Sequence, residues 1–93
     1  MKTDTYKIEG IEIEVERIDK ESANAERMLM AAKFKAIRET TAMNRKDFSE
    51  WLGIPYRTMQ EWELGRRQMP DYVLRLIAYK VRVEINEGRI GYE

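Results

Sequence analysis

Apolar and polar residues alternate near the start of the chain, between residues 6 and 18. A period of two is typical of a strand with one buried face and one solvent-facing face. The expected buried face consists of Ile11, Ile13 and Val15, and the expected solvent face consists of Glu12, Glu14 and Glu16. Just before them, Glu9-Gly10 can form the turn of a short hairpin. The pattern therefore predicts an acidic β-strand or hairpin at this end of the chain.

From Asp19 onward the spacing of the apolar residues becomes helical. Asp19 is a candidate N-cap, and the segment after it is rich in Ala, Met, Lys and Arg, which favour helices. Met30, Phe34 and Ile37 recur at helical spacing. These features predict a first helix that ends near Thr40.

Two short helices are predicted next. The first follows Asn44, which is a suitable cap with Asp47 three residues later, and it ends at Gly53. Its apolar side consists of Phe48, Trp51 and Leu52. The second covers residues 55–64, because the proline at its start has a fixed φ that suits a first helical turn and Gly65 stops it. Each helix is too short to bury its apolar face alone, so the two must pack across each other.

A fourth helix opens at Pro70 and keeps one apolar stripe. This stripe consists of Leu74, Ile77, Ala78, Val81 and Ile85. Its end is ambiguous, because residues 81–85 also alternate as a strand would and a Glu-Gly pair precedes residues 89–92, which could complete a hairpin. We expect the helix to end near Glu84.

Length and composition limit the class of protein. The chain has 93 residues, which suffice for one hydrophobic core and are too few for a two-domain enzyme. Its 43% hydrophobic residues, with only 5 Gly and 2 Pro, indicate a folded domain. It contains no Cys and no His, the residues of most nucleophilic, acid–base and zinc sites. We therefore expect no enzyme and no cofactor.

Neither a membrane segment nor a metal site is expected. No apolar run approaches the roughly 20 residues that span a bilayer, and no signal-peptide core follows the first residues, so the expected location is the cytoplasm. The three glutamates of the strand are candidate ligands for a hard cation. An amphipathic strand needs a solvent-facing side, however, and no further carboxylates complete a site.

Charge is distributed unevenly along the chain. The 17 Lys and Arg balance the 17 Asp and Glu. Residues 1–30 nevertheless carry 5 basic and 8 acidic side chains, whereas residues 31–80 carry 10 basic and 6 acidic ones. The whole molecule has no general attraction for a polyanion, so such a partner must meet the basic middle segment.

The middle of the chain resembles a known DNA-binding family. Residues 43–70 read MNRKDFSEWLGIPYRTMQEWELGRRQMP, which resembles the phage-repressor-like helix-turn-helix family often called Xre or Cro/cI. The matching elements are Phe48 and Leu52, the turn Leu52-Gly53-Ile54, and the close Trp62-Glu63-Leu64-Gly65-Arg66-Arg67. With flanking helices the resemblance covers about residues 33–80. It implies a mainly α fold, a small lambda-repressor-like bundle over residues 19–93 with its motif at 44–65 and a β-strand or hairpin extension at 1–18.

In that family the second helix of the motif lies in the DNA major groove. Here the helix turns Met59 and Trp62 to one side, so that the opposite side faces outward. The residues expected to read bases are Tyr56, Arg57, Gln60 and Glu61. Arg57 suits a bidentate contact to guanine, Gln60 a contact to adenine, and Glu61 a bond from cytosine. Tyr56 suits a thymine methyl group or a phosphate.

The resemblance also implies contacts to the DNA backbone. The positions that match the phosphate-binding ones of the family are Asn44, Arg45, Thr58, Arg66, Arg67 and Gln68. Such contacts position the protein without reading sequence. Glu61 and Glu63 are expected to place negative charge near the groove, which would lower the affinity for non-specific DNA.

Three positions depart from the family pattern. Ala42 stands where the family usually has Gly between the first two helices, which costs about 1 kcal/mol if this residue has a positive φ. Arg45 replaces the usual Gln at the start of the motif, and Pro55 replaces the usual Ser or Thr cap of the second helix.

These features together predict a sequence-specific transcriptional regulator that binds double-stranded DNA as a dimeric repressor. A homodimer joined through the exposed strand edge would place two recognition helices about 34 Å apart, one turn of DNA. The alternative is an antitoxin or adaptor that binds a toxin or another partner protein through residues 1–20, by analogy with small repressor-like antitoxins. At this point both roles of the N-terminal segment stay open.

Overall fold

The chain begins with an antiparallel hairpin. In the computed structural model, which describes residues 2–90, strand β1 (Thr3–Ile8) pairs with strand β2 (Ile11–Glu16). The two residues between the strands have positive φ, 47° at Glu9 and 87° at Gly10. Positive φ at both positions is the geometry of a type I′ turn, which matches the twist of paired strands. The predicted hairpin and its turn are confirmed.

After the hairpin, the described part of the chain forms four helices, and the strands and helices together make an α+β domain. The helices are α1 (Ala25–Glu39), α2 (Arg45–Leu52), α3 (Tyr56–Glu63) and α4 (Asp71–Asn86). The expected cap of α2 is present, because the side-chain oxygen of Asn44 accepts a hydrogen bond from the backbone N–H of Asp47 at 2.8 Å. Gly53 ends α2 in the left-handed conformation, with a φ of 72°.

The prediction that Asp19 caps the first helix is wrong. Its side-chain oxygen accepts a hydrogen bond from the N–H of Glu21 at 3.0 Å, and its carbonyl accepts one from the hydroxyl of Ser22 at 2.8 Å. Such local bonds of Asp and Ser favour turns over helices. The helix α1 begins only at Ala25, after Asn24 with a φ of 66°.

The helix α4 continues beyond the predicted end. It extends to Asn86 as a helix, so the alternative hairpin does not form over the described part of this segment. Gly88 has a φ of 74°, and the N–H of Arg89 donates to the carbonyl of Glu84 at 2.9 Å. This is the helix ending that a left-handed glycine allows. Residues 91 and 92 of that alternative lie outside the described residues.

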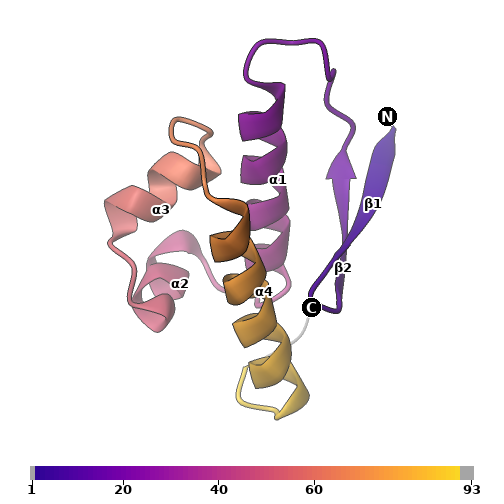
Figure 1. The fold of residues 1–93 in the computed structure, drawn as a ribbon. Coiled ribbons are helices and arrows are strands. Elements are labelled where there is room, and N and C mark those ends of the chain that lie inside the picture. Colours follow the sequence, from indigo (N-terminus) through magenta and orange to yellow (C-terminus); the bar gives the residue numbers. More distant parts are fainter. Residues whose placement is uncertain (1, 91–93) are drawn as a thin grey trace.

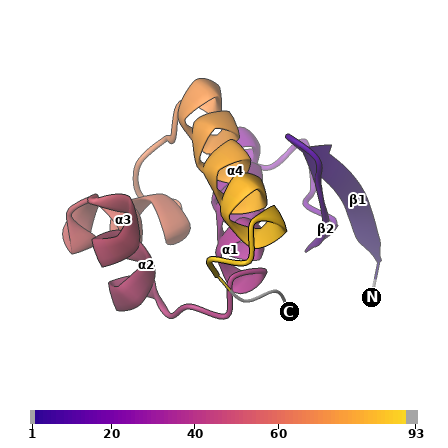
Figure 2. The ribbon, with the colours of Figure 1, turned by 90° about the horizontal axis from the view of Figure 1, so that it is seen from below.

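The helices α1 and α4 lie between the hairpin on one side and the α2–α3 pair on the other (Figure 1). Figure 2 shows the same order after a turn of 90°. The predicted apolar face of β2 is buried, and it belongs to one hydrophobic cluster with residues of every helix. The cluster includes Ile11, Ile13, Val15, Phe34, Ile37, Phe48, Met59, Leu74 and Val81. The hairpin is therefore part of the core and not an appended arm.

Candidate nucleic-acid interface

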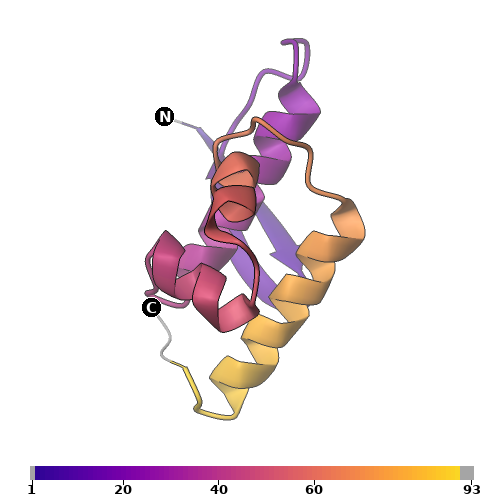
Figure 3. The same ribbon diagram turned by 90° about the vertical axis from the view of Figure 1, so that its left-hand side faces the viewer.

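A tight turn joins the short helices α2 and α3, which face the viewer in Figure 3. The N–H of Ile54 donates to the carbonyl of Ser49 at 3.0 Å across the glycine that ends α2. Pro55 then precedes α3, and its carbonyl accepts the first helical bond, from the N–H of Met59 at 3.1 Å. Because backbone bonds fix both sides of this turn, the direction in which α3 leaves α2 is fixed as well.

The two sides of α3 have opposite environments. Met59 is fully buried, and the ring of Trp62 meets Phe34 of α1 edge-on with 6.1 Å between ring centroids. Arg57 lies on the opposite side of the helix and reaches solvent, and the side chain of Tyr56, in the first turn, is 45% exposed. The inner face is held by the core, so the outer face is presented in a defined orientation.

The four predicted base-reading residues differ in accessibility. Tyr56 and Arg57 occupy the exposed first turn of α3, whereas Gln60 and Glu61 lie one turn later and are half-buried. Glu61 also pairs with Arg67, with 3.6 Å between the carboxylate oxygen and the guanidinium nitrogen. The first turn is the part of α3 that is most open to a ligand.

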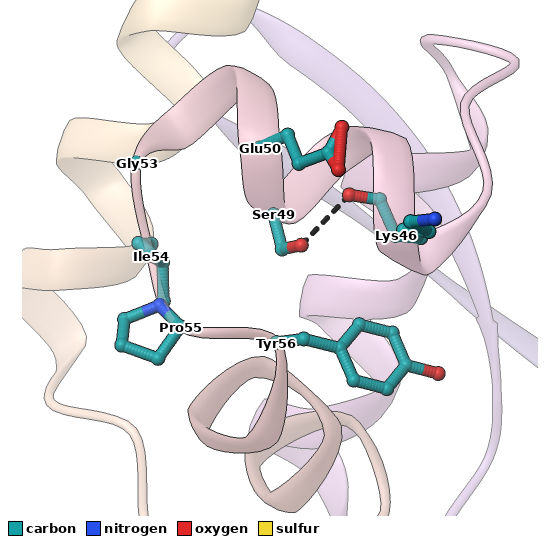
Figure 4. A pocket seen from close by; sticks show the side chains of 7 residues that line it. All are labelled: Lys46, Ser49, Glu50, Gly53, Ile54, Pro55 and Tyr56. Carbon is teal, nitrogen blue, oxygen red and sulfur yellow. Dashed lines mark hydrogen bonds between the residues drawn. The ribbon is translucent and has the colours of Figure 1, made fainter.

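A shallow hollow of about 630 Å³ lies beside this first turn (Figure 4). It is lined by Lys46, Ser49, Glu50, Gly53, Ile54, Pro55 and Tyr56. The hydroxyl of Ser49 donates to the carbonyl of Lys46 at 2.7 Å, and the side chains of Lys46 and Tyr56 both lie at the open side. Lys46 is exposed and was not among the predicted contacts. The sequence feature that could have identified Lys46 as a contact is its position directly after Arg45 in the first turn of α2.

The expectation that Glu63 places negative charge near the groove is wrong. The side chain of Glu63 is 1% exposed and accepts hydrogen bonds from Arg38 at 2.7 and 3.1 Å and from Arg45 at 3.2 Å. Arg38 also donates to the carbonyl of Met43 at 2.8 Å. Two guanidinium groups compensate the buried carboxylate. The resulting cluster links α1, α2 and α3.

The predicted phosphate-binding residues occupy different environments. Asn44, Arg66, Arg67 and Gln68 are exposed, and Arg45 and Thr58 are half-buried. Asn44 uses its side-chain oxygen as the helix cap, which leaves its amide N–H groups as donors. Arg45 is bound to Glu63, so part of its donor capacity is already used. The amide of Gln68 donates to the carbonyl of Met69 at 3.3 Å.

The backbone strain expected at Ala42 is present. Ala42 lies between α1 and α2 with a φ of 62°, in the left-handed region that favours glycine. Its N–H donates to the carbonyl of Glu39 at 3.2 Å. The neighbouring Thr41 hydroxyl donates to the carbonyl of Arg38 and accepts a bond from the N–H of Met43. The connection that positions α2 is thus ordered despite the unfavourable residue.

Within residues 2–90, no group of three or more acidic side chains is arranged to hold a metal ion, and no helix is long and apolar enough to cross a membrane. Glu12, Glu14 and Glu16 are exposed on the outer face of the hairpin. A hydrogen bond from Arg17 lowers the pKa of Asp4, next to the ends of the strands.

Comparisons with models of known protein families, with curated protein sequences and with solved structures give no match to this chain. Function must therefore be inferred from the surface that the structure assembles. The exposed residues around α3 are Tyr56 and Arg57 in its first turn and Arg66 and Arg67 in the loop after it, and Lys46 of α2 lines a hollow with Tyr56.

Proposed function

We propose that this protein is a sequence-specific DNA-binding transcriptional regulator in which α2 and α3 form a helix-turn-helix. The observation that carries the proposal is the exposed first turn of α3, where Tyr56 and Arg57 reach solvent and Tyr56 lines the same hollow as Lys46. Buried contacts on the inner side of α3 hold this turn in place. A helix held in this way can enter the major groove without a prior change of shape.

Arg57 is the main base-reading residue of this proposal. Its planar guanidinium matches the two acceptors of guanine, and such a contact contributes roughly 1–3 kcal/mol of discrimination. Tyr56 contacts a thymine methyl group or a phosphate. Gln60 and Glu61 have secondary roles, because both are half-buried and Glu61 must first leave Arg67 before it accepts a bond from cytosine.

The DNA backbone is held from both ends of this surface. Arg66 and Arg67 follow α3, and Asn44 and Lys46 belong to the start of α2. These groups are exposed donors, and donors of this kind bind phosphates without reading sequence. Arg45 is shared between this role and its bond to Glu63.

We propose that the regulator acts as a dimeric repressor. Two-fold dimers of such proteins place two recognition helices about 34 Å apart, which matches successive major grooves. The alternative is an adaptor that binds a partner protein through the hairpin. For this function the hairpin offers only part of its surface to a partner. The apolar side of β2 is buried in the core, so only the acidic outer face and the strand edges remain.

The proposal is tested by selecting random DNA duplexes with the purified protein and sequencing the bound fraction. On the preferred site, Arg57→Ala should reduce discrimination at one base pair by roughly tenfold or more. Arg57→Lys keeps the charge and loses the two-pronged contact, so it should lose the same discrimination with a smaller loss of total affinity. Arg66→Ala is the matched control, because it should weaken binding to all sequences alike.

Two outcomes would contradict the proposed role of Arg57 or the proposed DNA binding. Full discrimination by Arg57→Ala at every position would remove Arg57 from the base-reading role. If no sequence were enriched even at low salt, sequence-specific DNA binding itself would be rejected, and the adaptor function would become the better hypothesis.

A further inference from the structure

The helix α4 has apolar side chains on two opposite faces. One face is the core stripe that contains Leu74, Ile77, Ala78 and Val81. At about 100° per residue, Leu76 lies on the opposite side of the helix, with Tyr72 and Tyr79 one turn before and after it. These three side chains are 64%, 60% and 51% exposed, respectively. Single exposed apolar residues are ordinary, but a stripe over consecutive turns of one helix is typical of an interaction surface.

We propose that two copies of this chain pair through the α4 stripe of Tyr72, Leu76 and Tyr79, with the two helices antiparallel. A two-fold interface uses the same patch on both copies, so the patch must be complementary to itself. The stripe meets this condition, because Leu76 has a tyrosine four residues before it and another three residues after it. An antiparallel copy brings Leu76 next to its own counterpart and each Tyr72 level with the Tyr79 of the other copy.

Charges beside the stripe agree with the same register. Asp71 lies near the start of α4. Its carboxylate side chain is 69% exposed and accepts a hydrogen bond from Arg75 of the same helix at 2.9 Å. In an antiparallel pair centred on Leu76, this carboxylate comes level with Lys80 and Arg82 of the other copy. Asp71 and Arg82 lie on the same side of the stripe, and antiparallel helices bring equal sides together. Each Asp71 therefore lies between the Arg75 of its own copy and the Arg82 of the other copy, and this arrangement occurs once on each side of the two-fold axis.

The surface around the stripe is shaped to receive a side chain. A hollow of about 350 Å³ is lined by Glu9, Tyr72, Arg75, Leu76 and Tyr79. Arg82 lies over the ring of Tyr79, 5.2 Å from its centroid, and donates to the carbonyl of Glu9 at 2.6 Å. These contacts restrain one wall of the hollow, so a tyrosine or leucine of the second copy enters a largely formed recess.

The location of α4 leaves the candidate DNA surface open. In Figure 1, α4 lies at the front of the molecule, whereas α2 and α3 lie to its left. Pairing through the outer face of α4 does not use the exposed first turn of α3. The biological role of this dimer rests on the proposed DNA-binding function. The dimer is tested without DNA, so that the pairing and the DNA binding can each fail independently of the other.

The first test measures the monomer–dimer equilibrium of the full chain by sedimentation equilibrium in the absence of DNA. Leu76→Glu should raise the dissociation constant of the dimer at least about tenfold, because each dimer acquires two charges at its centre. Leu76 is largely exposed, so the variant should keep the far-ultraviolet circular dichroism and melting temperature of the parent. Thr5→Lys, which introduces a charge at an exposed position of β1 opposite Glu14, is the control and should leave the constant unchanged.

The second test uses the absence of native cysteines in the chain. Leu76→Cys should form a disulfide-linked dimer rapidly under mild oxidation, because the two-fold axis places the two positions side by side. Thr5→Cys reports on pairing through the strand edge and should remain mostly monomeric. Rapid crosslinking of Thr5→Cys with slow crosslinking of Leu76→Cys would overturn the proposal in favour of the hairpin. A parent protein that stays monomeric at all accessible concentrations would overturn it as well.

Discussion

At the scale of single residues, Ala42 offers a direct test of backbone strain. Its φ of 62° is unfavourable for any residue with a Cβ, whereas glycine adopts this conformation readily. Ala42→Gly should therefore stabilise the protein by roughly 0.5–1 kcal/mol, after allowance for the greater freedom of glycine in the unfolded chain. The melting temperature, followed by circular dichroism, should rise by a few degrees.

The same change at Ala36 is the control for Ala42→Gly. Ala36 lies within α1, where glycine is a poor helix former, so Ala36→Gly should destabilise the protein by about 1 kcal/mol. Opposite signs for the two substitutions would separate the conformational effect from the loss of a methyl group. A fall in stability for Ala42→Gly would show that the methyl group of Ala42 matters more than its φ.

Residue-scale predictions from sequence succeeded where local chemistry determines the outcome. The cap at Asn44 and the inward direction of Met59 follow from neighbours within a few positions. Glu63 could not be placed in this way, because its partners Arg38 and Arg45 are 25 and 18 positions distant. The direction of a charged side chain near the end of a helix depends on tertiary packing, which no local pattern specifies.

At the scale of elements, the hairpin turn and α4 are held together by a close contact. A Cβ at Gly10 would lie 2.5 Å from the Cδ atom of Arg82, the residue that donates to the carbonyl of Glu9. Gly10→Ala therefore combines the strain of a positive φ with displacement of Arg82. Gly88 also has a positive φ, of 74°, but has open space around it.

The two glycines make a matched pair for measurement. Gly88→Ala should cost about 1 kcal/mol in the free energy of urea unfolding, from backbone strain alone. Gly10→Ala should cost roughly a further 1 kcal/mol, because the bond from Arg82 to the hairpin is weakened. Equal losses would mean that Arg82 does not fasten the hairpin to α4.

Element positions were largely predictable because glycine, proline and asparagine mark where elements begin and end. Gly53 ends α2, and Pro55 and Pro70 precede α3 and α4. The role of the hairpin was less predictable, since an amphipathic strand can bury its apolar face against its own helices or against a partner. Only the packing of β2 on α1 shows that the first possibility is realised.

At the scale of the whole molecule, the separation of surfaces supports the proposed binding of DNA by a chain with no net charge. The hairpin, which carries the exposed Glu12, Glu14 and Glu16, and the α2–α3 pair lie on opposite sides of α1 and α4 (Figure 1). Exposed charges farther apart than about 8–10 Å are largely screened at physiological salt. The glutamates of the hairpin therefore would not cancel the proposed attraction between phosphates and the basic residues of the α2–α3 surface.

The salt dependence of the proposed DNA binding tests both this separation and the proposed two-fold pairing. Each phosphate contact contributes about 0.9 to the slope of log affinity against log salt for duplex DNA. Arg66→Ala should therefore flatten the slope by about 0.9 if one chain binds, and by about 1.8 if a two-fold dimer binds. Lys7→Ala removes an exposed cation from β1 and should leave the slope unchanged. The slopes can be measured by fluorescence anisotropy on the selected duplex, with Leu76→Glu as the monomeric comparison. If Arg66→Ala and Lys7→Ala flattened the slope equally, DNA would not be held specifically at the α2–α3 surface.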